Sequence, residues 1–265
     1  MTKTEVSEET RTAFQILARG NGAAIEEVIA EVYRALAEDW PAPLIVVDGG
    51  ANVGYHTKRM ANVPNISKVI AIEANPQTYE SHVRANTNAP HFAKVSLVQA
   101  AIQDDPFATS IKFTMSLSHP GRSGINPIMA LNDKTTTFEE PIVVAATTID
   151  KLTAGQGKCG FIKLDLEGTE FAALRGARQT LLRDTPVCVF ENGGQAPALG
   201  GYTLEDFIAY IRSVGMTLMT VYGDEFSVRN ARDFWYAWAV PTNRFEEVRA
   251  VIVDKLQARM ATEPA

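Results

Sequence analysis

Apolar side chains recur at helical spacing through the first forty residues. The pattern runs from about residue 8 to residue 40 and is interrupted at residues 20–22, which include two glycines. Prolines then end the helical pattern, and residues 44–47 form a continuous apolar run that stops at Asp48. The sequence therefore predicts two helices followed by a buried central strand.

Beyond this strand, short apolar runs alternate with segments of helical periodicity. Such alternation indicates right-handed crossovers between parallel strands. We expect further strands at residues 69–72, 95–98, 161–164 and 187–190, and helices at residues 55–62, 76–86, 170–182, 204–214 and 244–260. Asn75, followed by Pro76, is suited to begin the second of these helices.

Two regions depart from this alternation. Residues 107–146 hold strand patterns at 111–115 and 142–146 around a Gly- and Ser-bearing stretch, which indicates an insertion that shapes an acceptor site. Near the end, apolar runs at 216–221 and 234–240 are joined by a short polar link, which favours an antiparallel hairpin. The expected fold is α/β, with a mostly parallel sheet and helices on both faces. Residues 1–42 form a helical extension and residues 43–265 the main domain.

Charge and composition narrow the classes of partner. The formal net charge is −6, and the basic residues are interspersed with acidic ones, so we expect no nucleic-acid partner. No signal-peptide pattern or apolar run of bilayer length occurs, which predicts a cytoplasmic protein without a membrane partner. Cys159 and Cys188 adjoin apolar strands and are expected to be buried free thiols.

A glycine-rich turn follows the first strand. It contains Asp48, Gly49, Gly50, Asn52 and Gly54, and its spacing differs from the G-x-G-x-x-G of dinucleotide sites. Glycine allows a close approach of the backbone to a ligand. An acidic residue at the strand end disfavours a pyrophosphate and favours a ligand that carries an amine.

A second carboxylate, Glu73, ends the next strand about twenty residues later. In nucleotide-binding folds a carboxylate at this place binds ribose hydroxyls. The turn and Glu73 together therefore predict a nucleoside site.

Three ordered motifs give the chain a family resemblance. DGGANVG, IEANP and FIKLDLEGTEFAALRGA, within about residues 44–191, resemble the FkbM family of class I methyltransferases. The resemblance implies a Rossmann-like fold and transfer of a methyl group from S-adenosylmethionine, typically to a hydroxyl oxygen. It also implies that Asp48, Gly50 and Gly54 hold the methionine part of the cofactor, Glu73 the ribose, and Ala101 with Ile102 the adenine. The other residues expected to bind the cofactor are Gly49, Asn52, Ala74 and Asp165. Asp104 or Asp105 could assist at the adenine, or both could belong to a solvated turn.

A further cluster of charged residues follows the strand at 161–164. Asp165 ends this strand at the edge where an open α/β sheet forms its cleft, and Glu167 lies on the same loop, so we expect both to be functional. Glu170 is expected to be a structural carboxylate at a helix start.

Methylation of a hydroxyl requires a base, and four residues are candidates. These are Asp165, Glu167, Glu191, which follows a buried strand, and His119, which lies in a loop. Arg122 in that loop could bind an anionic acceptor or be solvated, and His56 could simply pack near the cofactor. No zinc spacing occurs; Mg²⁺ held by the three carboxylates is an alternative that the sequence leaves open but does not indicate.

The sequence thus predicts an S-adenosylmethionine-dependent O-methyltransferase of a small molecule, such as a sugar or secondary metabolite. An NAD-dependent oxidoreductase is one alternative, but it predicts a G-x-G-x-x-G motif, which the sequence lacks. A non-catalytic nucleoside-binding module is another, but it predicts loss of the cleft carboxylates. The apolar stripes of the N-terminal helices should cover the cleft or pair with another subunit, so a homodimer is a further expectation.

Overall fold

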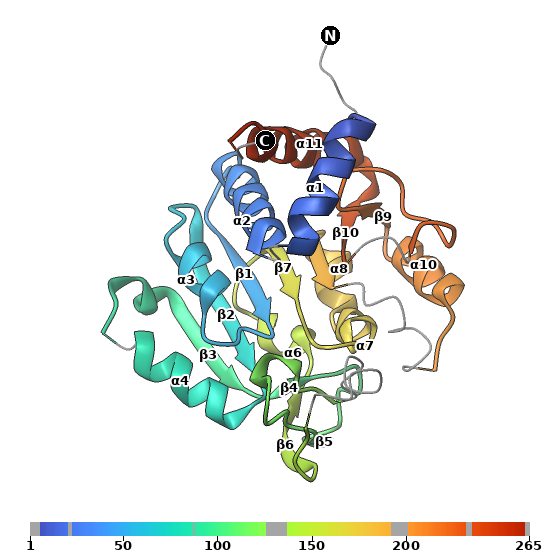
Figure 1. The fold of residues 1–265 in the computed structure, drawn as a ribbon. Helices are drawn as coiled ribbons and strands as arrows, with labels where there is room; N and C mark the ends of the chain where they lie inside the picture. The colour runs from blue at the N-terminus through green and yellow to red at the C-terminus, as the bar shows by residue number, and fades with distance from the viewer. Residues whose placement is uncertain are drawn as a thin grey trace.

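The computed structural model is built around a mostly parallel seven-stranded sheet (Figure 1). It describes residues 6–20, 23–86, 88–125, 137–191, 201–231 and 235–262. The strand order is β3-β2-β1-β7-β8-β10-β9, and β10 runs antiparallel to both of its neighbours. The strands are β1 (Leu44–Gly49), β2 (Ile66–Glu73), β3 (Val95–Gln99), β7 (Cys159–Leu164), β8 (Val187–Glu191), β9 (Met216–Thr220) and β10 (Tyr236–Pro241).

The central strand β1 lies between β2 and β7. Val47 pairs with Ile70 on one side and with Ile162 on the other. Because these strands are parallel, their carboxyl ends meet at one edge of the sheet. That edge gathers Asp48, Glu73 and the residues that follow Leu164.

One face of the sheet is covered by helices from both ends of the chain (Figure 1). They are α1 (Glu8–Gly20), α2 (Ala23–Glu38), α3 (Tyr55–Ala61) and α11 (Phe245–Thr262). Ile29 and Leu256 from these helices share one core cluster with Val46, Phe161 and Trp238 from the strands.

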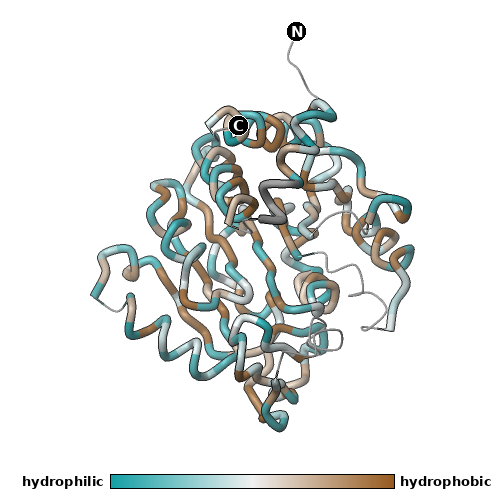
Figure 2. Tube along the Cα trace, in the orientation of Figure 1, coloured by the Kyte–Doolittle hydropathy of each residue, from teal (hydrophilic) through white to brown (hydrophobic). Residues whose placement is uncertain are grey.

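The other face is covered by α6 (Ile149–Thr153), α7 (Glu170–Arg175), α8 (Arg178–Asp184) and α10 (Leu204–Ser213). Alternate strand residues such as Val47 and Ile162 point to this side, where they pack with Leu174 and Ile211. Apolar segments are concentrated along the central strands, as a layer buried on both sides requires (Figure 2).

The fold class and the closing antiparallel hairpin agree with the sequence prediction. Residues 232–234, where the last strand was expected to begin, lie outside the described residues. The single helix expected over 170–182 is instead two helices, α7 and α8, separated at Gly176. A Cβ at Gly176 would lie 2.3 Å from the carbonyl oxygen of Gln103, so the close approach of that neighbouring segment explains the glycine.

Two strands of the inserted region, β5 and β6, form a small second sheet of order β4-β6-β5 with β4, which precedes the insertion. Its strands are β4 (Ala101–Ile102), β5 (Ser110–Phe113) and β6 (Ile142–Thr147). Before it come α4 (Pro76–Asn86) and a short 3-10 helix, η1 (Pro90–Lys94), and within it lies η2 (Pro120–Arg122); η4 (Thr242–Arg244) precedes α11. The part of the insertion from 126 to 136 lies outside the described residues.

The apolar stripe of α2 is buried within the single chain. Ile25, Val28, Ile29, Val32 and Leu36 belong to the core cluster under α11 and α3. A homodimer therefore stays a prediction without the support that an exposed stripe would have given.

Cys159 and Cys188 are buried free thiols. Among the described residues, no helix combines the length and apolarity that crossing a membrane requires.

Candidate active site

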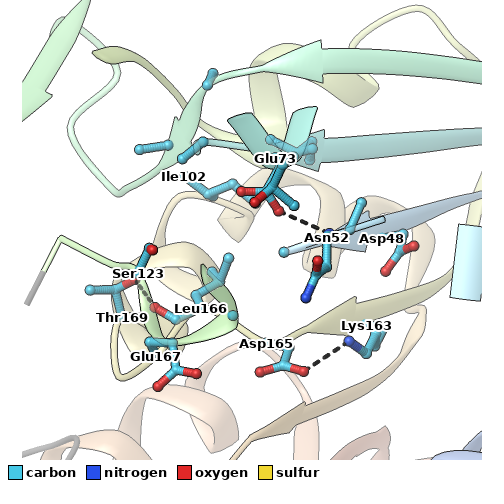
Figure 3. Close-up of a pocket in the computed structure, with 18 of the residues that line it drawn as sticks. Asp48, Asn52, Glu73, Ile102, Ser123, Lys163, Asp165, Leu166, Glu167 and Thr169 are labelled. Carbon is cyan, nitrogen blue, oxygen red and sulfur yellow. Dashed lines mark hydrogen bonds and ion pairs between the residues drawn. The ribbon is translucent and has the colours of Figure 1, made fainter. Parts of the chain in front are cut away.

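A pocket of about 280 Å³ opens at the carboxyl ends of β1, β2 and β7 (Figure 3). Its volume is near the lower end of the range of small-molecule sites, roughly 300–1,000 Å³. Polar side chains line one end and apolar side chains the other. The strand order alone explains the location, because the sheet's crossover connections change direction beside β1.

The glycine turn after β1 brings two loops into contact. Gly50 has φ of +75°, and a Cβ there would lie 1.9 Å from the carbonyl oxygen of Asp165. The amide of Asp165 in turn donates to the carbonyl of Gly49 at 3.0 Å. Gly50 is therefore required by the approach of the Asp165 loop, in addition to any ligand.

Asp48 has one carboxylate oxygen without a partner. The side chain is 0% exposed, and its Oδ2 accepts a hydrogen bond from Thr57 at 2.6 Å. Its Oδ1 is buried and has no hydrogen-bond partner among the described residues. A buried carboxylate oxygen in this state is costly unless a donor reaches it, and an ammonium group in the pocket would be such a donor.

Glu73 stands at the end of β2 and holds the glycine turn. Its Oε2 accepts from the amide of Asn52 at 2.8 Å (Figure 3), and its Oε1 accepts from the amide of Asn75 at 2.8 Å. Burial raises the pKa of this carboxyl above its usual value. Each carboxylate oxygen can accept a further hydrogen bond, so ribose hydroxyls fit beside these amides.

The apolar end of the pocket is formed by β2, β4 and the inserted region. It is lined by Ile72, Ala101, Ile102, Phe113 and Ile125. An aromatic base would bury its faces against these side chains.

Lys163 is a buried ammonium at the polar end. It is 3% exposed, and its Nζ lies 3.2 Å from Oδ2 of Asp165 (Figure 3). Burial lowers the pKa of Lys163, but the charges of Asp165, Asp48 and Glu26 outweigh burial and raise it above its usual range. Carboxylates therefore outnumber the ammonium at this end of the pocket.

Three carboxylates gather where the pocket adjoins the loop after β7. Oxygens of Asp165, Glu167 and Glu191 lie within 4.8 Å of one another. Burial and the charges of Asp165 and Glu170 raise the pKa of Glu167 to about 8. Burial, together with Asp165, Glu170 and Glu167, raises the pKa of Glu191 well above its usual value. Glu167 therefore exchanges a proton near neutral pH, which suits proton transfer.

Glu170 supports the loop that carries these carboxylates. Its Oε1 accepts from the amides of Leu166 at 2.7 Å and Gly168 at 3.3 Å. Burial raises its pKa to about 7. The expected structural role thus consists of hydrogen bonds to the preceding loop.

A known protein family matches the chain independently of this geometry. A model of the methyltransferase FkbM domain matches residues 48–218, which is more than half of the chain. The chain belongs to the FkbM methyltransferase family. A search of curated proteins gave no match.

The chain also resembles solved methyltransferase structures, at low sequence identity. The methyltransferase FkbM from Methylobacillus flagellatus is 16% identical with a TM-score of 0.46, over 75% of this chain and 43% of that one. The chain therefore spans less than half the length of that relative. A TehB-like SAM-dependent methyltransferase from Corynebacterium glutamicum is 12% identical with a TM-score of 0.41, over 88% of this chain and 96% of that one.

The plantazolicin methyltransferase BamL, solved in complex with a triazolic desmethylPZN analog and SAH, is 10% identical with a TM-score of 0.46, over 98% of this chain and 86% of that one. The family assignment rests on the match over residues 48–218. The same match leaves the oxidoreductase alternative without support.

Most of the predicted site residues of the FkbM protein lie around one pocket. Those that line it are Asp48, Gly50, Asn52, Glu73, Ala74, Ala101, Ile102, Asp165 and Glu167. Glu191 does not line it but lies within the carboxylate group. Gly49 and Gly54 lie behind the lining; a Cβ at Gly54 would lie 2.3 Å from Nε2 of His82.

His119 and the two aspartates after β4 lie outside the pocket lining. His119 is exposed, and its ring Nδ1 lies 3.1 Å from the hydroxyl of Ser118. Asp104 pairs with Arg175 at 3.1 Å, and Asp105 accepts from the amide of Phe107 at 2.8 Å. Asp104 therefore has a structural partner on α7, and Asp105 has one within the turn.

Arg122 and His56 have partners of different kinds. The charge of Arg122 favours the ionised form of Glu167, although burial and the neighbouring carboxylates outweigh it and raise the pKa of Glu167. His56 lines the pocket and contacts Glu26, so it is a site residue as well as a packing residue.

The sequence analysis did not identify Glu26 and Lys163, which both line the pocket. Both had a recognisable signal, since each is a charged residue among apolar neighbours. Glu26 precedes the buried Ile29, Ala30 and Tyr33 by three, four and seven positions, so it shares their helix face. A charged residue on a buried face needs a partner or a function.

Proposed function

We propose that this FkbM methyltransferase is an S-adenosylmethionine-dependent O-methyltransferase that acts on a hydroxyl of a small molecule. The observation that carries the proposal is one pocket with an unpartnered buried carboxylate oxygen at Asp48 and an apolar end at Ile102. These ends match the charged amino-acid part and the base of the methyl donor, and Glu73 between them matches the ribose.

The residues of the polar end would hold the amino-acid part of the donor. Oδ1 of Asp48 would accept from the ammonium group, and Asn52 would contribute a side-chain amide. When bound, S-adenosylmethionine supplies a methyl group on a sulfonium whose thioether is a good leaving group. The task left to the protein is to align the acceptor and remove its proton.

Glu167 is the base that we favour for this step. It lines the pocket, and its pKa of about 8 lies close to neutral pH, where a general base works best. With donor and acceptor bound, the carboxylate of Glu167 would take the hydroxyl proton as the acceptor oxygen accepts the methyl group and the donor leaves as a neutral thioether. Asp165 and Glu191 adjoin Glu167, and the charge of Asp165 helps to raise its pKa, whereas the exposure of His119 makes it a weaker candidate.

The insertion supplies the remaining wall of the pocket and, in this proposal, part of the acceptor site. Gly121 and Ser123 line the pocket. The hydroxyl of Ser123 accepts from the amide of Ser116 at 3.0 Å and lies 3.3 Å from the side-chain amide of Asn75. The loop is therefore tethered to the start of α4, and it could hold an uncharged polyol such as a sugar.

Isothermal titration with S-adenosylmethionine and, separately, NAD⁺ tests the cofactor. We expect micromolar binding of S-adenosylmethionine, no heat with NAD⁺, and loss of binding in Asp48→Ala and Glu73→Ala. Asp104→Ala is the matched control, because Asp104 pairs with Arg175 outside the pocket lining. Heat with NAD⁺ and silence with S-adenosylmethionine would overturn the proposal.

The acceptor is then sought by measuring S-adenosylhomocysteine release with panels of sugars, phenols, amines and carboxylic acids. Turnover with hydroxyl compounds only would support O-methylation. Turnover with amines only would refute it while leaving the methyltransferase assignment intact.

A further inference from the structure

One acidic residue of the N-terminal helix α2 reaches the active-site pocket. Glu26 lies in the first turn of α2 and lines the pocket beside His56 and Lys163. Its side chain is 24% exposed, and the neighbouring face of the helix is buried in the core. A carboxylate in this position loses much of its hydration, so its contacts must compensate.

Both oxygens of Glu26 are engaged by other elements of the fold. Oε2 contacts Nε2 of His56 on α3, and Oε1 accepts from the hydroxyl of Tyr236 on β10 at 2.6 Å. Burial raises the pKa of Glu26, but the hydrogen bond with His56 and the charge of Lys163 outweigh it and lower the pKa to about 2. Glu26 is therefore a fixed negative charge at neutral pH.

The hydroxyl of Tyr236 also lies close to the carboxylate of Asp165. It lies 3.1 Å from Oδ2 of Asp165, the same oxygen that Lys163 contacts at 3.2 Å. Tyr236 is 6% exposed, so its ring has little freedom to move away. A tyrosine hydroxyl has a single hydrogen, so Glu26 and Asp165 share it; Tyr236 and Lys163 together fix the Asp165 carboxylate, and Glu26 fixes the Tyr236 hydroxyl.

We propose that Glu26 is a positioning residue of the methyl-donor site: the N-terminal helix completes the polar end of the pocket by fixing Asp165 through Tyr236. The inference rests on the proposed function, since it assigns this end of the pocket to the amino-acid part of S-adenosylmethionine.

The charges around Lys163 support the assignment. Glu26, Asp48 and Asp165 all act on this single ammonium. The excess of carboxylates suits a ligand that brings positive charge, as the ammonium and sulfonium of the donor do. Among the described residues, the hydrogen-bond partners of Glu26 are His56 and Tyr236, and neither belongs to the apolar end with Ile102.

The test is the binding of two ligands to four forms of the full-length protein. The ligands are S-adenosylmethionine and 5′-methylthioadenosine, which keeps the nucleoside but lacks the amino-acid part. The forms are wild type, Glu26→Gln, Tyr236→Phe and the double variant. Glu27→Gln is the matched control, because Glu27 also joins α2 to α3, through Tyr55 at 2.6 Å and through Arg59, but does not line the pocket.

We expect Glu26→Gln and Tyr236→Phe each to weaken S-adenosylmethionine binding by about tenfold, and the double variant to be no weaker than about the worse single one. Binding of 5′-methylthioadenosine should stay within about twofold in all forms, and Glu27→Gln should resemble wild type. Damage to the fold would weaken the binding of both ligands. A loss of S-adenosylmethionine binding alone therefore distinguishes positioning from instability. Tyr236→Phe keeps the ring in the core and supplies the test if Glu26→Gln does not fold.

Three results would overturn the inference. One is unchanged S-adenosylmethionine binding in Glu26→Gln. Another is fully multiplicative effects in the double variant, which would mean that Glu26 does not act through Tyr236. The third is equal weakening of both ligands. If wild type itself binds no S-adenosylmethionine, the proposed function fails and the inference fails with it, which is a separate outcome.

Discussion

The hydroxyl of Tyr236 lies 2.6 Å from Oε1 of Glu26, although 210 residues separate them in the chain. The contact joins the last strand of the sheet to a helix that precedes the first strand. Through it, the last strand holds Glu26, which lines the pocket.

Glu26→Gln should make the stability of the protein less dependent on pH below about 4.5. The folded-state pKa of about 2 lies below the ordinary value of 4.5, so ionised Glu26 stabilises the fold above pH 4.5. That contribution is lost as the pH falls from 4.5 through about 2. We expect Glu26→Gln to cost about 2 kcal/mol of unfolding free energy at pH 7, and the difference from wild type to shrink by pH 3. Urea unfolding at several pH values measures this, and a difference that does not change with pH would contradict it.

Glu167→Gln should stabilise the protein at alkaline pH. The folded-state pKa of about 8 lies above the ordinary 4.5, so the folded state keeps a proton that the unfolded state has lost. Stability therefore falls as the pH rises from 4.5 to 8, and the neutral glutamine avoids that loss. After allowance for solvent screening we expect a gain of about 1–2 kcal/mol at pH 9 and none at pH 4. The exposed Glu140→Gln serves as control, and equal gains at both pH values would contradict this origin.

Glu167 should also determine the rate of methyl transfer, which can be measured once an acceptor is found. Glu167→Gln should lower kcat by roughly 10²- to 10⁴-fold, as expected for loss of a general base, while leaving the affinity for S-adenosylmethionine nearly unchanged. In wild type, kcat/KM should rise with pH and level off above about 8, where Glu167 is ionised. A rate profile without this rise, or a variant with wild-type kcat, would assign the base role elsewhere in the carboxylate group.

Gly50→Ala should be among the most damaging substitutions in the chain. The new Cβ would lie 1.9 Å from a backbone oxygen of Asp165, and φ of +75° is unfavourable for alanine. We expect a loss of at least about 3 kcal/mol in unfolding free energy. Gly155→Ala isolates the backbone cost, because Gly155 has φ of +70° and nothing within 4 Å of its Cβ position. It should lose only about 1–2 kcal/mol. Thermal unfolding compares the two, and similar losses would contradict the clash.

The sequence by itself determined the layered sheet and the edge that holds the site. Buried strands read as apolar runs and helices as periodic ones, so the alternation indicated parallel crossovers. Residues such as Asp48, Glu73 and Asp165 could be located because each directly follows such a run, and parallel strands end at one edge.

Only the tertiary structure decided which distant side chains complete the site. The contact of Glu26 with His56 and Tyr236 depends on how α2 packs across the sheet. The need for Gly50 depends on the approach of the Asp165 loop, and the break at Gly176 depends on the carbonyl of Gln103. Local periodicity reports which face of an element is buried, but contacts between elements far apart in the chain depend on the packing of the whole fold. A charged residue on an apolar face therefore shows in the sequence, whereas its partner does not.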